Sequence, residues 1–263
     1  MPQFSANLTM MFTDTDFLSR FERASQAGFK AVEFMFPYDF EKDRIIEKLD
    51  RYALKVVLHN FPAGNWAAGD RGLACLPDRV GEFQEKTGKA IEYAKALKCP
   101  RLNCMSGLIQ KNSSPEKTHQ TLVNNLKYAA AALAREKICL VIEPINYYDM
   151  PGIYLNYTRQ ALDIIDEVNH PNIRLQYDIY HAQVLEGNLS KTIRENIGMI
   201  EHMQLADVPG RHEPGTGEIN FNNLFKFIDE AGYGGWIGCE YKPAAKTEDG
   251  LDWVKAFLKK EGK

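Results

Sequence analysis

The sequence predicts an α/β protein with the architecture of a (β/α)8 barrel, and three observations lead to this prediction. Eight short apolar segments alternate with longer amphipathic segments along the chain of 263 residues. The short segments have the nearly continuous apolar character of strands that are covered on both faces. No linker or low-complexity segment divides the chain, and its length is ordinary for one barrel. We therefore expect a single domain over residues 1–263.

The expected strands are distributed through the whole chain. No GxGxxG motif follows the first of them, which disfavours an open, doubly wound nucleotide-binding sheet. Eight consecutive units favour closure of a parallel sheet into a barrel. The strands are expected at residues 4–7, 31–34, 55–59, 101–105, 138–143, 173–178, 202–206 and 236–241.

Helical periodicity is clear in four of the connections. Phe17, Phe21 and Ala24, for example, fall on one stripe of a helix. The helices are expected at residues 17–27, 82–97, 122–133 and 161–168. Three glycines near helix ends are expected in the left-handed conformation: Gly28, Gly198 and Gly232. Three short polar residues are expected as N-caps: Thr158, Ser190 and Asn222.

Two connections are long and rich in glycine and proline, residues 60–79 and 208–220. Both follow an expected strand. They should therefore lie at the carboxyl-terminal face of the barrel, where the active sites of such barrels are built.

Composition argues against several classes of partner. The formal net charge is -3 and no basic stripe is present, so we expect no nucleic-acid binding. No apolar run has the length of a membrane span, and the N-terminus lacks the pattern of a secretory signal. The five cysteines form no CxxC pair, which is typical of reduced core thiols. We expect a cytoplasmic protein with a small-molecule substrate, and leave homo-oligomerisation open.

Four polar side chains lie at the carboxyl ends of the last four expected strands. In a barrel these strands are neighbours, so the side chains should converge, and clustered carboxylates repel one another unless a cation neutralises them. An all-oxygen ligand set suits Mn²⁺ or Mg²⁺, with Co²⁺ as a substitute, better than Zn²⁺. The expected metal ligands are Glu143, Asp178, Gln204 and Glu240. Asp207 follows Gln204 closely in the sequence.

Further candidates surround these ligands. Arg211, beside His212 in the loop after Gln204, would grip a substrate carboxylate or hydroxyl. His181, His59 and Lys242 are the other expected substrate-binding residues, although a helix cap and a solvated lysine are the plainer interpretations of His181 and Lys242. Glu33 is expected to hydrogen-bond a loop outside the site, and three histidines are interpreted as structural or solvated: His119, His170 and His202.

Several segments give the chain a resemblance to the hydroxypyruvate isomerase family, within the xylose-isomerase-like TIM barrels. They are FSANLTMMF, GFKAVEFMFPY, EPIN, YDIYHAQVLEGNL, VPGRHEPGTGEINF and, as the most specific, GWIGCEYKPAAKTEDGLDW. The resemblance covers nearly the whole chain. It implies a parallel barrel in which Glu143 and Glu240 act as the acid–base pair.

The wider group contains ketose 3-epimerases, and the resemblance extends to their sites. They bind Mn²⁺ or Co²⁺ through positions that match Glu143, Asp178, Gln204 and Glu240, and hold substrate at positions that match His181 and Arg211. The third ligand is commonly histidine where this chain has Gln204. Family members often read NTPPG where this chain has residues 60–64, NFPAG, after His59, a departure that bears on substrate size.

The resemblance implies interconversion of hydroxypyruvate and tartronate semialdehyde by proton transfer through an enediolate. Three alternatives remain open. One is a related isomerase acting on a 2-oxo-tetronate, or a ketose 3-epimerase. The second is a metal-dependent DNA repair nuclease, against which the scattered histidines and the acidic balance argue. The third is a non-catalytic binder of sugar acids.

Overall fold

The computed structural model describes residues 1–258. Its eight parallel strands follow one another in sequence order around a closed sheet, which confirms the predicted (β/α)8 barrel. All eight expected strands are present, with ends that differ by at most two residues from those predicted. They are β1 (Gln3–Asn7), β2 (Ala31–Phe34), β3 (Lys55–Asn60), β4 (Arg101–Asn103), β5 (Cys139–Ile142), β6 (Ile173–Asp178), β7 (Ile200–Leu205) and β8 (Trp236–Cys239).

The helices fill the connections between the strands. The four that the sequence indicated are α1, α3, α4 and α5. Helix α4 extends well beyond the predicted 122–133, because Ser114 caps it eight residues before that range, with Pro115 in its first turn. The helices are α1 (Phe17–Gln26), α2 (Lys42–Tyr52), α3 (Val80–Ala96), α4 (Pro115–Arg135), α5 (Thr158–Val168), α6 (Ile179–Leu185), α7 (Leu189–Asn196), α8 (Phe221–Glu230) and α9 (Lys255–Leu258).

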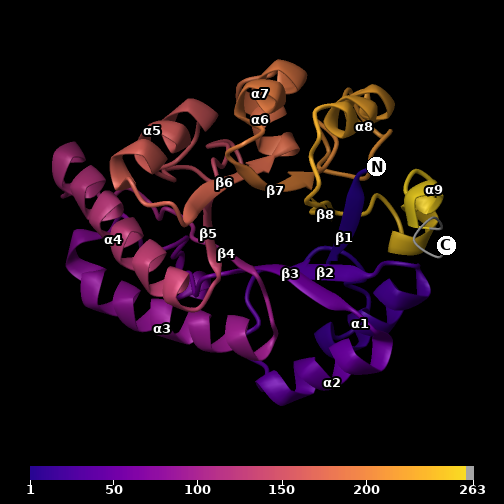
Figure 1. The fold of residues 1–263 in the computed structure, drawn as a ribbon, viewed down its shortest axis with the longest axis horizontal. Helices are drawn as coiled ribbons and strands as arrows, with labels where there is room; N and C mark the ends of the chain where they lie inside the picture. Colours follow the sequence, from indigo (N-terminus) through magenta and orange to yellow (C-terminus); the bar gives the residue numbers. More distant parts are fainter. Residues whose placement is uncertain (259–263) are drawn as a thin grey trace. The chain divides into compact units, whose positions relative to one another are not determined.

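The described residues form two compact units. The first holds residues 1–34, 40–57 and 177–258, and the second holds residues 35–39 and 58–176. In the first unit β1 pairs with β2 and with β8, β7 pairs with β8, and α1 packs beside α2 (Figure 1). In the second unit β4 pairs with β3 and β5, and α3 packs beside α4 (Figure 1).

Aromatic side chains dominate one end of the core of the first unit. The ring of Phe4, 2% exposed, meets Phe225, Trp253 and Phe257 edge to face at centroid distances of 5.1–5.2 Å. Such contacts add to the gain from burying large apolar surfaces. The cluster joins β1 to α8 and to the C-terminal segment.

Several expected helix boundaries are wrong. Thr158 is the first residue of α5 rather than its cap, and Ser190 and Asn222 lie inside their helices. Asn220 caps α8 instead, because its side chain accepts the backbone N–H of Asn223. Gly28 and Gly232 have the expected positive φ, whereas Gly198 does not.

The structure also bears on two expectations from composition, those about the cysteines and about membrane-spanning segments. Every cysteine is a free thiol, and Cys139 alone of the five is not fully buried. Within residues 1–258, none of the helices combines the length and hydropathy of a bilayer-spanning segment.

Candidate active site

The carboxyl ends of the last three strands bring three of the predicted ligands into the interior of the first unit. Asp178 ends β6, Gln204 lies next to the end of β7, and Glu240 directly follows β8. Their exposed fractions are 2%, 1% and 6%. The Nε2 group of Gln204 donates a hydrogen bond to Oε2 of Glu240 at 2.7 Å. The predicted convergence is therefore observed for these three side chains.

Arg211 supplies the positive charge beside these carboxylates. Its Nη2 donates to Oε1 of Glu240 at 2.8 Å and lies 3.9 Å from Oδ2 of Asp178. The guanidinium also stacks on the ring of Tyr180, with 4.9 Å between its carbon and the ring centroid. Arg211 thus occupies the place at which the sequence predicted a substrate-gripping arginine.

The loop that carries Arg211 is organised around Asp207, which is 1% exposed. The two oxygens of Asp207 accept the backbone N–H groups of Val208, Gly215, Gly217 and Ile219 at 2.9–3.0 Å. Arg211 itself has φ +54, and its backbone N–H donates to the carbonyl of Asp207 at 2.9 Å. A charged acceptor therefore fixes a long loop that has little regular structure of its own.

Burial and neighbouring charge shift the pKa of both acids in this group. Burial raises the pKa of Glu240, and Asp178 and Glu33 raise it further, whereas Arg211 and Gln204 oppose the shift. Burial also raises the pKa of Asp178, and Arg211 partly offsets this. A carboxyl group with a raised pKa can accept and return a proton near neutral pH, as general acid–base catalysis requires.

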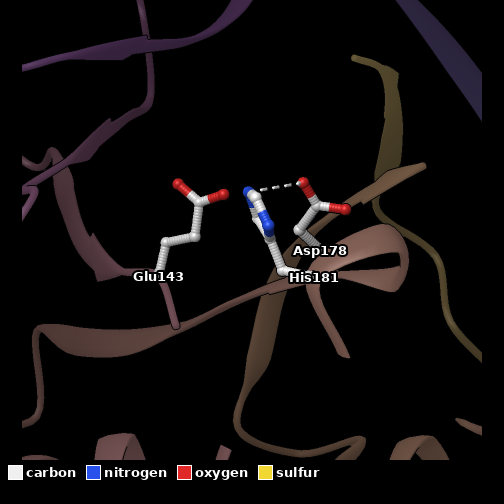
Figure 2. Close-up of side chains that lie close together, drawn as sticks. All are labelled: Glu143, Asp178 and His181. Atoms are coloured by element: carbon white, nitrogen blue, oxygen red, sulfur yellow. Dashed lines mark ion pairs between the residues drawn. The ribbon is translucent and has the colours of Figure 1, made fainter. Parts of the chain in front are cut away.

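His181 lies in the first turn of α6, next to Asp178, which caps that helix by accepting the backbone N–H of Tyr180 at 2.8 Å. Nε2 of His181 lies 3.6 Å from Oδ2 of Asp178 and 3.4 Å from Nη2 of Arg211. Figure 2 marks the contact between His181 and Asp178 with a dashed line. Burial lowers the pKa of His181, and Arg211 lowers it further. A lowered pKa favours the neutral imidazole, the form that can act as a ligand or as a hydrogen-bond acceptor.

Glu143 follows β5 in the second unit and is 5% exposed. Nδ2 of Asn103, the last residue of β4, donates to Oε2 of Glu143 at 2.7 Å. This partner was not predicted, although a polar residue at the end of the fourth strand was the available signal. Asn103 gives Glu143 a fixed orientation.

Asp178 and His181 lie next to each other in the first unit, where each presents a donor atom, a carboxylate oxygen and an imidazole nitrogen (Figure 2). Carboxylates and imidazoles are both donors that divalent cations accept in proteins. Asp178, one of the expected ligands, thus has a further donor, His181, beside it. In the same unit both oxygens of Glu240 accept N–H donors, Oε1 from Arg211 and Oε2 from Gln204.

His59 is fully buried in the second unit, and its Nδ1 lies 3.3 Å from the hydroxyl of Tyr38 and 3.2 Å from the carbonyl of Asn60. Burial lowers its pKa to about 4 from an ordinary 6.5. Its role in substrate binding stays a prediction.

We expect His59 to make stability pH-dependent. The unfolded chain takes up a proton there below about pH 6.5 and the folded chain only below about pH 4. Stability should therefore fall as the pH falls through this window, by about 3 kcal/mol from this residue. Urea unfolding of the parent protein and of His59→Gln at pH 7 and 4.5 measures the difference. Equal pH dependence in the two proteins would contradict this expectation.

Lys242 contributes through its backbone in this structure. Its N–H donates to the carbonyl of Arg211 at 2.8 Å, and its carbonyl accepts from Nδ1 of His212 at 2.7 Å. Its side chain is exposed and lines a cavity of about 490 Å³ together with Thr9 and Thr247. Substrate binding by the ammonium group stays a prediction.

Glu33 and His202 have more specific surroundings than the sequence indicated. Oε2 of Glu33 lies 2.8 Å from Nε2 of His202, and both side chains are fully buried. Burial would raise the pKa of Glu33, but the charge and hydrogen bond of His202, with bonds from Gln204 and Asn7, lower it below its usual range. His202 and Gln204 are two residues apart on one strand and so share a face, which was the overlooked signal. His119 also has partners, the hydroxyl of Tyr154 and the carboxylate of Glu167.

Comparison with known proteins agrees with the barrel fold described above. The family model of the xylose isomerase-like TIM barrel matches residues 21–257. The chain belongs to this family. It is 51% identical to hydroxypyruvate isomerase of Escherichia coli, over 98% of this chain and 100% of that protein. It is 44% identical to 2-oxo-tetronate isomerase of Cupriavidus necator, over 98% and 99% of the two chains. The expected class, an isomerase, is confirmed.

A solved structure of this family has the same fold. It is the crystal structure described as AP endonuclease, family 2, from Brucella melitensis, with a TM-score of 0.96 and 43% identity, covering 98% of this chain and 99% of that one. The similarity extends over nearly all of both chains.

Proposed function

We propose that the protein interconverts hydroxypyruvate and tartronate semialdehyde. The observation that carries the proposal is the buried carboxyl group of Glu240, held between Arg211 and Gln204 with a raised pKa. The name of the relative with 51% identity supports the choice of substrate. A small 2-oxo acid needs a cationic group for its carboxylate or for a developing oxyanion, and Arg211 is a suitable one.

The reaction moves a carbonyl group between adjacent carbons without a net change of oxidation state. One carboxylate removes a proton from the hydroxylated carbon of hydroxypyruvate, and the electron pair forms the double bond of an enediolate. The opposite carboxylic acid gives a proton to the neighbouring carbon. The proton of the first hydroxyl passes to the former carbonyl oxygen, so that the first oxygen becomes the new carbonyl and the second becomes a hydroxyl. Glu143 and Glu240 act as this pair, and Arg211 stabilises the negative oxygen as it develops.

We include a divalent cation, Mn²⁺ or Mg²⁺ with Co²⁺ as a substitute, in this proposal. Glu143, Asp178, Gln204 and Glu240 are the proposed ligands, and the neutral imidazole of His181 is a further donor. When bound, the cation polarises the substrate carbonyl and so favours removal of the neighbouring proton.

Removal of the cation gives a direct test. Dialysis against a chelator should lower the rate of hydroxypyruvate isomerisation by at least about tenfold, and Mn²⁺ should restore it. Mg²⁺ and Co²⁺ are then compared at equal concentration. Full activity in protein shown by elemental analysis to be metal-free would contradict the metal requirement while leaving the isomerase activity in place.

The substrate itself is tested with a panel. Hydroxypyruvate, a 2-oxo-tetronate and free ketoses are compared by kcat/KM, because relatives at 40–44% identity carry the name 2-oxo-tetronate isomerase. We expect the highest value with hydroxypyruvate. A preference of tenfold or more for the four-carbon acid would replace the proposed substrate within the same reaction class.

A nuclease is the second candidate, because the solved structure at 43% identity is described as an AP endonuclease. The formal net charge of -3 is unfavourable for binding a nucleic-acid backbone. A nicking assay on DNA with an abasic site, with Mn²⁺ and without it, separates the two candidates. We expect no cleavage.

We further propose a cytoplasmic location. The free thiols of all five cysteines support it, because disulfides are rare in reducing compartments.

A further inference from the structure

A second buried carboxylate, that of Glu33, shares two amide donors with Glu240 and takes no part in the proposed reaction. Glu33 is the third residue of β2, and its side chain is fully buried. Gly238 of β8 faces it, and a Cβ at that position would collide with the Glu33 carboxylate. The strand therefore has a glycine at the point where room for this carboxylate is needed.

Two amide groups connect Glu33 to Glu240. Nδ2 of Asn7 donates to Oε1 of Glu33 and to Oε2 of Glu240, at 3.0 Å in each case. Nε2 of Gln204 makes the same pair of bonds, at 2.8 Å and 2.7 Å. Each NH2 group thus uses its two hydrogens on one oxygen of each carboxylate, and two parallel bridges join the acids.

The charge of Glu33 determines which way these amides face. A reversed amide would place its carbonyl oxygen against carboxylate oxygens, which repel it, so only the observed orientation is favourable. His202 and the hydroxyl of Ser5 bind the other oxygen of Glu33, at 2.8 Å and 3.0 Å. These two groups therefore bind Oε2 of Glu33, whereas the bridging amides bind Oε1.

We propose that Glu33 is a positioning residue for Glu240. Acting through Asn7 and Gln204, it fixes Oε2 of Glu240 and leaves Oε1 directed to Arg211, 2.8 Å away. The correct orientation of an acid–base group is worth a large factor in rate, because a small displacement removes it from its substrate. This inference rests on the proposed function of Glu240.

Glu33→Gln tests the inference, since it keeps the shape of the side chain but replaces one acceptor oxygen with a donor. If the new NH2 group faces the amides of Asn7 and Gln204, both bridges lose their acceptor on this side chain. If it faces His202 and Ser5, the acceptor remains, but the negative charge that orients the two amides is lost in either case. We expect kcat to fall by roughly 10–100-fold with KM changed by less than about threefold. A crystal structure of the variant should show the Glu240 carboxylate rotated away from Arg211.

Ser5→Ala is the matched control, because it removes one hydrogen bond to Glu33 outside the bridges and should keep kcat within about twofold. Asn7→Ala removes one bridge but leaves the Glu33–His202 pair intact. It should lower kcat by about tenfold with little change in KM. If Glu33→Gln does not fold, as shown by circular dichroism, Asn7→Ala decides the question.

The outcomes separate the inference from the function on which it rests. A parent protein that does not isomerise any acid of the panel refutes the proposed function. An active parent whose folded Glu33→Gln or Asn7→Ala variant keeps parental kcat, or whose Glu240 is undisplaced in the Glu33→Gln crystal, refutes the positioning role. Equal losses in Ser5→Ala and Glu33→Gln also refute it, because the effect then follows burial rather than the bridges.

Discussion

Replacing Glu240 with glutamine should lower kcat for hydroxypyruvate by about 10³-fold, within the range found when a general acid–base group is removed. The amide has nearly the shape of the carboxyl group, but it cannot exchange a proton with carbon. Burial and the bonds from Asn7, Gln204 and Arg211 hold the native group in one orientation, so water has little access with which to replace it. Steady-state kinetics with carbonyl detection of the product measures the change.

Glu218→Gln provides the control for this experiment. Glu218 is an exposed carboxylate of the same loop as Arg211, and its Oε1 accepts a hydrogen bond from Gln183 at 3.1 Å. Its replacement should leave kcat within about twofold. Thermal unfolding of both variants should stay close to that of the parent protein. A folded Glu240→Gln variant with more than a tenth of the parental kcat would refute the assignment of Glu240.

Replacing Asp207 with alanine should destabilise the fold by about 4 kcal/mol, because four backbone donors lose a buried, shared acceptor at once. Val208, Gly215, Gly217 and Ile219 all donate to this carboxylate. A Cβ at Gly217 would collide with the carbonyl of Val208, so this close approach of the loop to itself requires glycine. The same loop carries Arg211, so KM should also rise by at least about tenfold.

The Asp207→Asn variant tests how much each of the two carboxylate oxygens contributes to stability. The amide retains one acceptor oxygen, so the variant should lose about half as much stability as Asp207→Ala. Urea unfolding monitored by circular dichroism gives the free energy of unfolding for each protein, and steady-state kinetics give KM. A loss of less than about 1 kcal/mol in Asp207→Ala would show that the loop reorganises around water.

Much of the first unit's site could be predicted from the sequence. Asp178, Gln204 and Glu240 each follow an apolar run, and the carboxyl ends of neighbouring parallel strands meet at one end of a barrel. Their proximity therefore follows from strand order alone. Arg211 was predicted on weaker grounds, as a cation in a glycine-rich loop after β7, and the structure shows that Asp207 holds this loop in place.

The partners of these residues could not be predicted in the same way. Glu33 and His202 are 169 positions apart, and no local pattern links a residue in β2 to one in β7. The first residue of α8 could not be predicted either. It depends on which of several neighbouring asparagines accepts a backbone N–H of the first turn, and these asparagines are only one or two residues apart.

The barrel, its strands and the acids at their carboxyl ends could all be predicted from residue patterns, because periodicity and strand order act locally and in sequence. Only the three-dimensional structure showed that arginine and two amides surround Glu240, and that these amides join it to the buried carboxylate of Glu33. The physical reason is that hydrogen bonds between distant side chains depend on distances and angles that closure of the sheet sets, and no pattern along the chain records them.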